Sequence, residues 1–148
     1  MSYTYAYPRP ALTVDMLIFK KEEQNWKVLL IKRLRPPFKD CWAIPGGFMD
    51  ENELLIDAAK RELKEETGLT GIHLEQFRVY DAINRDPRHR TISGIFTGIA
   101  KDKTEVFAGD DAAEAAWFGI DELPETAFDH AQILKDVIGM YTKSSQFR

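Results

Sequence analysis

Three glutamates stand within one helical turn of each other in the sequence, at Glu62, Glu65 and Glu66. If each residue advances the helix by about 100°, Glu66 falls at roughly 40° and Glu65 at roughly 300° from Glu62. Three carboxylates this close repel one another and raise their own pKa values unless a cation lies among them. Hard divalent cations prefer oxygen ligands, and no cysteine or histidine is nearby. The spacing therefore predicts Mg²⁺ or Mn²⁺ rather than zinc, bound where the three side chains converge.

Residues 53–67 are the clearest helix in the chain. They contain no glycine or proline, are rich in Ala, Leu, Glu and Lys, and stop before Gly68, while Asp50 or Asn52 could cap the start. A glutamate-rich helix usually forms salt bridges along a solvated face. That alternative is disfavoured because Lys60 and Lys64 fall away from the glutamates, which share their arc with apolar residues. We therefore expect all three glutamates on the inward-facing arc.

Two basic clusters accompany the predicted metal site. One comprises Lys32, Arg33, Arg35 and Lys39, and the other comprises Arg85, Arg88 and Arg90. Mg²⁺ in proteins usually shares its coordination shell with substrate phosphates, and arginine suits bidentate contacts to phosphate. The combination predicts phosphoryl chemistry. For any single arginine, an ordinary solvated surface remains the alternative.

The remaining elements must position these side chains. Apolar runs at 12–19 and 26–34, separated by the polar stretch 20–25, predict two strands joined by a turn. Strands are also expected at 72–83 and 91–100, on either side of the polar loop 84–90, and at 115–118. Pro45-Gly46-Gly47 is interpreted as a breaker. A last helix is expected over 129–141, with Asp129 as its N-cap and His130 in a structural role. Residues 1–10, with three tyrosines and two prolines, are expected to form an arm.

Composition narrows the class of protein. The 148 residues are 44% hydrophobic and 30% charged, which predicts one folded domain over 1–148 with a sizeable core. The net charge of −4 disfavours general binding to nucleic acid, and no apolar run is long enough to span a membrane. The single Cys41 cannot form an intrachain disulfide, so we expect a reducing compartment, the cytoplasm.

The stretch from Gly47 to Leu69 resembles a complete Nudix box: a glycine, five residues, a glutamate, seven residues, then Arg-Glu-Leu-Lys-Glu-Glu-Thr-Gly-Leu. Membership of the Nudix hydrolases would imply an α/β/α sandwich around a mixed β-sheet, and hydrolysis of a nucleoside diphosphate linked to another moiety. By matching position, the main metal ligands would be Glu62, Glu65 and Glu66, with the Gly46 carbonyl also near a cation. Arg61 would orient these glutamates by ion pairing, and Glu53 would support the site.

Segments outside the box resemble a narrower branch, the ADP-ribose pyrophosphatases, and also the Nudix-like domains of transcriptional regulators of NAD metabolism. They are residues 9–15, 42–48, 85–90, 109–112 and 127–130. This resemblance implies cleavage of ADP-ribose to AMP and ribose 5-phosphate. Residues expected to contact substrate are Arg33, Arg35, Phe48, Arg85 and Arg88, where Phe48 either stacks on the base or ribose or only packs.

Several acidic residues could accept a proton from the attacking water. Glu114, Asp110 and Asp111 are the candidates, and Glu114 lies three residues before Trp117, a placement that resembles the late-loop acid of other Nudix enzymes. The alternative for these acids is a capped turn.

Two rival functions stay open. One is a module that senses ADP-ribose without hydrolysing it, and the other is hydrolysis of a nucleotide sugar, a dinucleotide or an oxidised nucleotide. The intact box favours an enzyme, as do the few residues after the last predicted helix, too few for a DNA-binding winged helix.

Partners are expected to be a small nucleotide substrate and a second copy in a homodimer, with no nucleic acid and no membrane. The arm, with Tyr3, Tyr5 and Tyr7, could complete a neighbouring subunit's adenine pocket.

Overall fold

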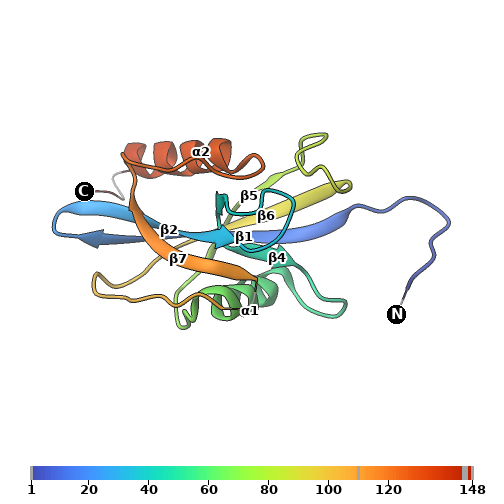
Figure 1. Cartoon of the computed structure of the whole chain (residues 1–148), viewed down its shortest axis with the longest axis horizontal. Helices are drawn as coiled ribbons and strands as arrows, with labels where there is room; N and C mark the ends of the chain where they lie inside the picture. Colours follow the sequence, from blue (N-terminus) through green and yellow to red (C-terminus); the bar gives the residue numbers. More distant parts are fainter. Residues whose placement is uncertain (1, 110, 145–146, 148) are drawn as a thin grey trace.

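A mixed β-sheet lies between two helices in the computed structural model of the chain, which describes residues 2–109, 111–144 and 147 (Figure 1). In chain order the elements are β1 (Ala11–Glu22), β2 (Asn25–Arg33), β3 (Trp42–Ala43), β4 (Gly46–Phe48), α1 (Leu55–Thr67), β5 (Glu75–Tyr80), β6 (Thr91–Ile99), β7 (Ala112–Gly119) and α2 (His130–Lys143). The strand order is β3-β2-β1-β6-β5, with β4 added to β1 and β7 added to β2. Because α1 and α2 cover opposite faces, the expected α/β/α sandwich is confirmed.

Strand β1 is the centre of the sheet and contributes to both halves of the core. It pairs antiparallel with β2 and β4 and parallel with β6, which makes the sheet mixed. Val14, Met16 and Ile18 pack in the cluster that contains the buried residues of α1. Leu17 and Phe19 pack in the cluster that contains the buried residues of α2. A strand buried on both faces has few polar residues, so a buried charge in it requires an explanation.

Most of the predicted elements form, with shifted ends. The β1–β2 hairpin turns at Glu23 and Gln24, both at positive φ, as in a type I′ turn. Strand β1 is therefore longer than the predicted 12–19, while β2 keeps the predicted length and begins one residue earlier. Strand β5 is shorter than the predicted 72–83, and β7 is longer than the predicted 115–118. Helix α2 begins one residue after the expected Asp129, which is its N-cap residue.

The interpretation of Pro45-Gly46-Gly47 as a breaker is confirmed for Pro45, which lies in the bend between β3 and β4. It is wrong for the two glycines, because Gly46–Phe48 forms β4 and pairs with β1. Glycine is required here by close approach. A Cβ atom on Gly46 would overlap the Asp15 carboxylate and the Val14 carbonyl, and one on Gly47 would overlap the Glu62 carboxylate. The two glycines therefore let one strand lie against β1 on one side and against the glutamates of α1 on the other.

Helix α1 differs from expectation at its start. It begins at Leu55 rather than at residue 53, and its N-cap residue is Leu54, which makes no side-chain capping bond, so neither Asp50 nor Asn52 caps it. The Glu53 side chain instead accepts the Asp50 amide at 2.7 Å, which shapes the loop before the helix. The predicted end is confirmed, since Gly68 adopts φ 78° and donates to the Lys64 carbonyl.

Residues 2–10 form the expected arm without helix or strand and are exposed. The Tyr3 hydroxyl donates to Glu51, its ring stacks on Tyr5, and the Arg9 guanidinium lies 3.9 Å from the Tyr5 ring centre. Across the described ranges, neither helix is long and apolar enough to cross a membrane.

Candidate active site

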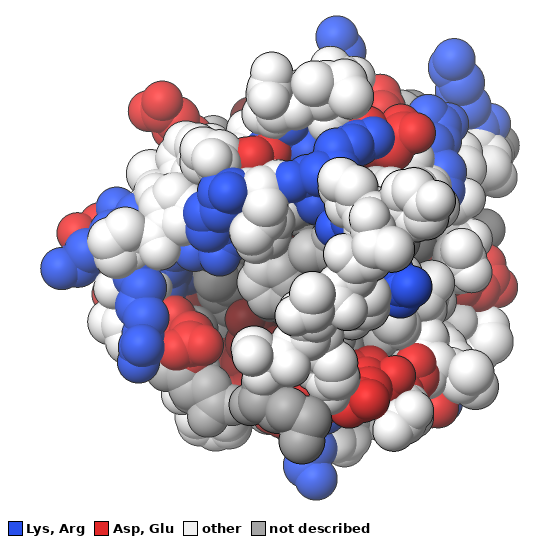
Figure 2. All heavy atoms as spheres, turned by 90° about the vertical axis from the view of Figure 1, so that its right-hand side faces the viewer, with Lys and Arg blue, Asp and Glu red and all other residues white. Residues whose placement is uncertain are grey.

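A cavity of about 400 Å³ opens at the end of the sheet where β4, α1 and the 85–88 loop meet. Its walls differ in charge. Acidic groups from α1 and nearby loops include Glu62, Glu66 and Asp111, while Arg33, Arg85 and Arg88 come from β2 and the 85–88 loop. Figure 2 shows this end of the molecule hollowed, with basic side chains above the hollow and acidic ones below. A cavity with opposed charges suits a ligand that carries both phosphates and a cation.

Arg61 donates hydrogen bonds to several groups on the acidic side of the cavity. Its Nε and Nη2 atoms donate to the two Glu53 carboxylate oxygens at 3.0 and 2.6 Å. Its Nη1 atom donates to Glu62 at 2.8 Å and to Glu65 at 3.2 Å, and Nη2 also donates to the Phe48 carbonyl at 3.0 Å. These bonds raise the pKa of Arg61. The guanidinium thus joins the loop before α1, the β4 end and two glutamates, as the family resemblance implies for Arg61 and Glu53.

The three glutamates differ in exposure, and the expectation that all face inward is wrong for Glu65. Glu66 is buried, and its Oε2 accepts the Gly46 amide at 3.0 Å. Glu62 is half-buried and lines the cavity. The Glu65 side chain is 42% exposed and does not line the cavity. Glu65 lies at the edge of the apolar arc, where the surface of α1 faces solvent rather than the sheet.

The expectation that the three carboxylates converge on one point is also wrong. Within residues 2–109, 111–144 and 147, no three acidic, histidine or cysteine side chains are gathered closely enough to hold a metal ion. The reason is that Arg61 draws Glu62 and Glu65 to its Nη1 atom, while Glu66 is turned to the Gly46 amide. Glu62 and Glu66 therefore line the cavity without sharing a single centre, and Glu65 lies outside the lining.

The donor groups nevertheless fit a divalent cation. Burial raises the pKa of Glu66 to about 8, and the charges of Glu62, Asp15 and Asp111 add to the effect. Burial also raises the pKa of Glu62. Carboxylates with unfavourable solvation, facing a cavity, are stabilised as anions by a bound cation. Because every donor is oxygen, the chemistry of the set suits Mg²⁺ or Mn²⁺.

Of the late acids offered as proton acceptors, Asp111 lies at the cavity and Glu114 does not. Glu114 is on β7 opposite Lys32, is more than half exposed, and is absent from the cavity lining. Asp111 lines the cavity and its Oδ1 lies 3.3 Å from Arg35 Nε. The segment before it is fixed by α1, because the amides of Phe107 and Gly109 donate to the last carbonyls of that helix. Asp110 lies outside the described residues.

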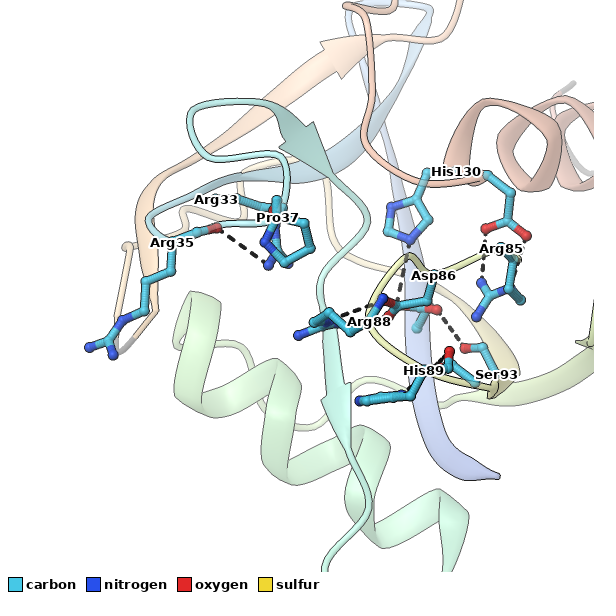
Figure 3. Close-up of polar contacts among 12 residues, drawn as sticks. Arg33, Arg35, Pro37, Arg85, Asp86, Arg88, His89, Ser93 and His130 are labelled. Atoms are coloured by element: carbon cyan, nitrogen blue, oxygen red, sulfur yellow. Dashed lines mark hydrogen bonds and ion pairs between the residues drawn. The ribbon is translucent and has the colours of Figure 1, made fainter. Parts of the chain in front are cut away.

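The predicted substrate arginines fall into two kinds. Arg85 donates through two nitrogens to Asp129, both at 2.9 Å, and its side chain is only 5% exposed, so this guanidinium is a structural tie to α2 (Figure 3). Arg35 lines the cavity but is 73% exposed and pairs with Asp111.

Arg33 and Arg88 instead face the cavity beside aromatic rings. Arg88 donates through Nε and Nη2 to Asp86, at 3.1 and 2.8 Å, with its guanidinium 5.3 Å from the Phe48 ring centre (Figure 3). Arg33 donates to the Pro37 carbonyl at 2.7 Å. The Phe48 ring also contacts His89 at 5.7 Å between ring centres. Phe48 is therefore placed to hold Arg88 as well as to meet a ligand.

The floor of the cavity contains two acids that the sequence reasoning missed, Asp15 and Asp86, beside His130, for which it predicted a structural role. Asp15 on β1 is 7% exposed and accepts the Ser93 hydroxyl. His130 accepts the Ile44 amide through Nδ1 at 2.9 Å, so a neutral ring carries its proton on Nε2, which lies 4.0 Å from Asp15. The available signal was the single aspartate within the apolar run of β1. Asp86, buried and paired with Arg88, gave no such signal.

Comparison with known proteins agrees with this architecture. Residues 9–137 match the family model described as NUDIX domain. The chain is 45% identical over 130 residues to an ADP-ribose pyrophosphatase of Methanocaldococcus jannaschii, covering 88% of this chain and 74% of that protein. It is 30% identical over 145 residues to the ADPR responsive transcriptional repressor NtrR of Acinetobacter baylyi, covering 95% of this chain and 58% of that protein.

A solved structure is similar over the same region. The NUDIX domain of Shewanella oneidensis NrtR complexed with ADP ribose superimposes with a TM-score of 0.83 at 27% identity, covering 91% of this chain and 90% of that one. The shared fold therefore includes both helices and the sheet that carry the cavity.

Proposed function

The chain belongs to the Nudix family, and on that premise we propose that it hydrolyses the pyrophosphate bond of ADP-ribose to AMP and ribose 5-phosphate. The observation that carries the proposal is the cavity in which buried carboxylates of α1 face Arg33 and Arg88. The 45% identity to a protein named as an ADP-ribose pyrophosphatase, over most of both chains, supports this substrate.

Glu62 and Glu66 would hold Mg²⁺ or Mn²⁺ at the carboxylate wall, with Glu65 and the Gly46 carbonyl as further ligands. The cation would polarise a phosphorus–oxygen centre, orient a water molecule and lower the pKa of that water. Arg61 keeps Glu62 and Glu65 in fixed orientations, and the Gly46 amide does the same for Glu66. Arg33 and Arg88 would neutralise the charge that develops on the phosphate oxygens.

We further propose Asp111, in place of Glu114, as the acid that accepts a proton from the attacking water. Its support is position, since Asp111 lines the same cavity as Glu62 and Glu66, whereas Glu114 is exposed beside Lys32.

A second candidate function is binding of ADP-ribose without hydrolysis. The relative named as an ADPR responsive repressor and the similar domain in complex with ADP ribose favour it. Because one relative is named as a transcriptional repressor, the expected absence of a nucleic-acid partner stays a prediction. The expected homodimer also stays a prediction.

The test is a panel of nucleoside diphosphate derivatives with Mg²⁺, scored by release of AMP or another nucleoside monophosphate. We expect ADP-ribose to be turned over fastest, and Glu66→Gln to lose about 100-fold or more in kcat while staying folded. Asp57→Asn is the matched control, because Asp57 is an exposed acid on the same helix.

Two results would contradict the proposal. Tight ADP-ribose binding with no turnover of any compound would favour the sensing function instead. Full turnover by Glu66→Gln would show that this carboxylate is not needed for metal-dependent catalysis.

A further inference from the structure

Phe128 has an unusual backbone conformation for a bulky residue. It lies two residues before α2 and adopts φ 53°, in the left-handed region that favours glycine. A non-glycine residue is strained in this region, and such conformations persist only where the surrounding structure imposes them. Phe128 also lines the cavity. We therefore infer that packing against neighbouring residues holds the Phe128 ring in place.

The ring contacts two cationic side chains of the cavity. The Arg33 guanidinium carbon lies 5.0 Å from the Phe128 ring centre, and that of Arg88 lies 5.8 Å from it. Phe38 and His130 pack on the same ring, at 4.8 and 5.4 Å between ring centres. Guanidinium groups within about 6 Å of an aromatic ring are attracted by its quadrupole. One phenylalanine thus brings together arginines from β2 and from the 85–88 loop.

Both guanidinium groups donate to fixed oxygen acceptors, and in each of them one nitrogen stays available. Arg33 donates through Nε and Nη2 to the carbonyls of Pro37 and Arg35, and Arg88 donates through Nε and Nη2 to Asp86 (Figure 3). Toward the part of the chain that the structure describes, Nη1 of neither arginine makes a hydrogen bond. Each arginine at the cavity therefore keeps one donor nitrogen available while its guanidinium lies near the Phe128 ring.

The two arginines also lie within each other's field. Burial lowers the pKa of Arg33, and the charge of Arg88 adds to this effect. Two positive groups brought together against their repulsion, with spare donors, favour an anion between them. Phosphate fits, because guanidinium groups bind its oxygens with directed hydrogen bonds.

We propose that Phe128 is a positioning residue that holds Arg33 and Arg88 as a two-arginine subsite for one phosphate group. The assignment rests on the proposed function in naming the ligand: in a diphosphate substrate, one phosphoryl group lies at the carboxylate wall and its neighbour lies on the two arginines. Arg85 and Arg35 do not belong to this subsite, since Asp129 occupies the first and the second is mostly exposed.

The experiment measures binding of inorganic phosphate to metal-free protein in EDTA, by ³¹P NMR titration. This readout needs neither metal nor hydrolysis. We expect wild-type protein to bind phosphate, and Phe128→Leu to bind it about tenfold more weakly, the loss expected when two partly buried cation–π contacts are removed. Phe128→Tyr keeps an aromatic face and should retain most of the affinity. Arg88→Lys keeps the charge but not the planar stack, and should lose affinity as Phe128→Leu does.

Phe77→Leu is the matched control. Phe77 also stacks on an arginine, with the Arg78 guanidinium 4.4 Å from its ring centre, but neither residue lines the cavity. Its phosphate affinity should equal that of the wild type. A double variant with Phe128→Leu and Arg88→Lys should lose less than the sum of the two single losses, because the substitutions remove the same contact.

Phosphate binding tests the two-arginine subsite, and ADP-ribose turnover tests the proposed function, so each can fail without the other. Absence of phosphate binding by the wild type, equal affinity in Phe128→Leu, or an equal loss in Phe77→Leu would overturn the inference. In ADP-ribose turnover, the inference predicts that Phe128→Leu raises KM about tenfold with little change in kcat. If the wild type hydrolyses no ADP-ribose but the phosphate results hold, the subsite stands and the proposed function fails.

Discussion

At the scale of single residues, the acidic side of the cavity depends on one guanidinium. Arg61 contacts Glu53, Glu62 and Glu65 and lies 3.3 Å from Asp50. Without it, these carboxylates would repel one another and leave the positions they have around β4 and α1. The fork of donors matters as much as the charge, because Nε and Nη2 together bind both oxygens of Glu53.

We therefore predict that Arg61→Lys, which keeps the charge but loses the fork, weakens Mn²⁺ binding and lowers kcat by about 10- to 100-fold each. Electron paramagnetic resonance of free Mn²⁺ measures the first effect without turnover. Lys60→Ala, an exposed neighbour on α1, is the control. Unchanged Mn²⁺ affinity in Arg61→Lys would show that the glutamates hold their positions without the arginine.

At the scale of elements, the start of α2 supports the cavity floor. His130 accepts the Ile44 amide from the segment between β3 and β4, and its Nε2 faces Asp15 on β1. Arg85 joins the 85–88 loop to Asp129 at the same helix end. Three segments far apart in the sequence thus meet at one helix terminus, and the site keeps its shape only if that terminus stays in place.

This arrangement predicts a pH-dependent stability. Burial lowers the pKa of His130 below its usual 6.5. As pH falls through that value, the unfolded chain takes up a proton that the folded protein does not, so folding stability decreases. The loss between pH 7 and pH 5 reaches about 2 kcal/mol if the folded ring stays neutral.

His130→Asn offers an oxygen to the Ile44 amide but does not titrate. Its unfolding free energy, measured in urea at both pH values, should therefore fall less than that of the wild type. A decrease of the same size in both proteins would contradict the assignment of this effect to His130.

At the scale of the whole molecule, the distribution of charge matters more than its sum. The net charge is −4, yet the cavity divides into an acidic wall and an arginine wall. Two of the acids on that wall, Glu62 and Glu66, are shielded from solvent and have raised pKa values. A divalent cation bound there would offset their repulsion in the folded state only, and so would stabilise the fold.

Saturating Mg²⁺ or Mn²⁺ should raise the thermal unfolding midpoint by about 5–10 °C, from roughly 2.7 kcal/mol of binding free energy at a hundredfold excess over Kd. Glu66→Gln should show a much smaller shift in the same scanning fluorimetry experiment. NaCl at equal ionic strength controls for screening. An equal shift in wild type and Glu66→Gln would place the stabilising cation elsewhere.

The sequence by itself determined what depends on neighbours along the chain. The motif from Gly47 to Leu69 predicted the helix and its end at Gly68. Its resemblance to the Nudix box implied the ion pairs of Arg61 with the glutamates. The β1–β2 hairpin followed from two apolar runs and a short polar turn. The helix and the hairpin need only local geometry and periodicity.

Only the tertiary structure decided which polar groups meet across distant segments. It placed Asp111 in the cavity and Glu114 outside, and it assigned Arg85 to Asp129 while leaving a nitrogen of Arg88 free of bonds to the described residues. It also brought the Phe128 ring near two arginines, Arg33 and Arg88. The physical reason is that long-range pairs form where packed elements happen to converge, and periodicity along one element contains no information about its neighbours in space.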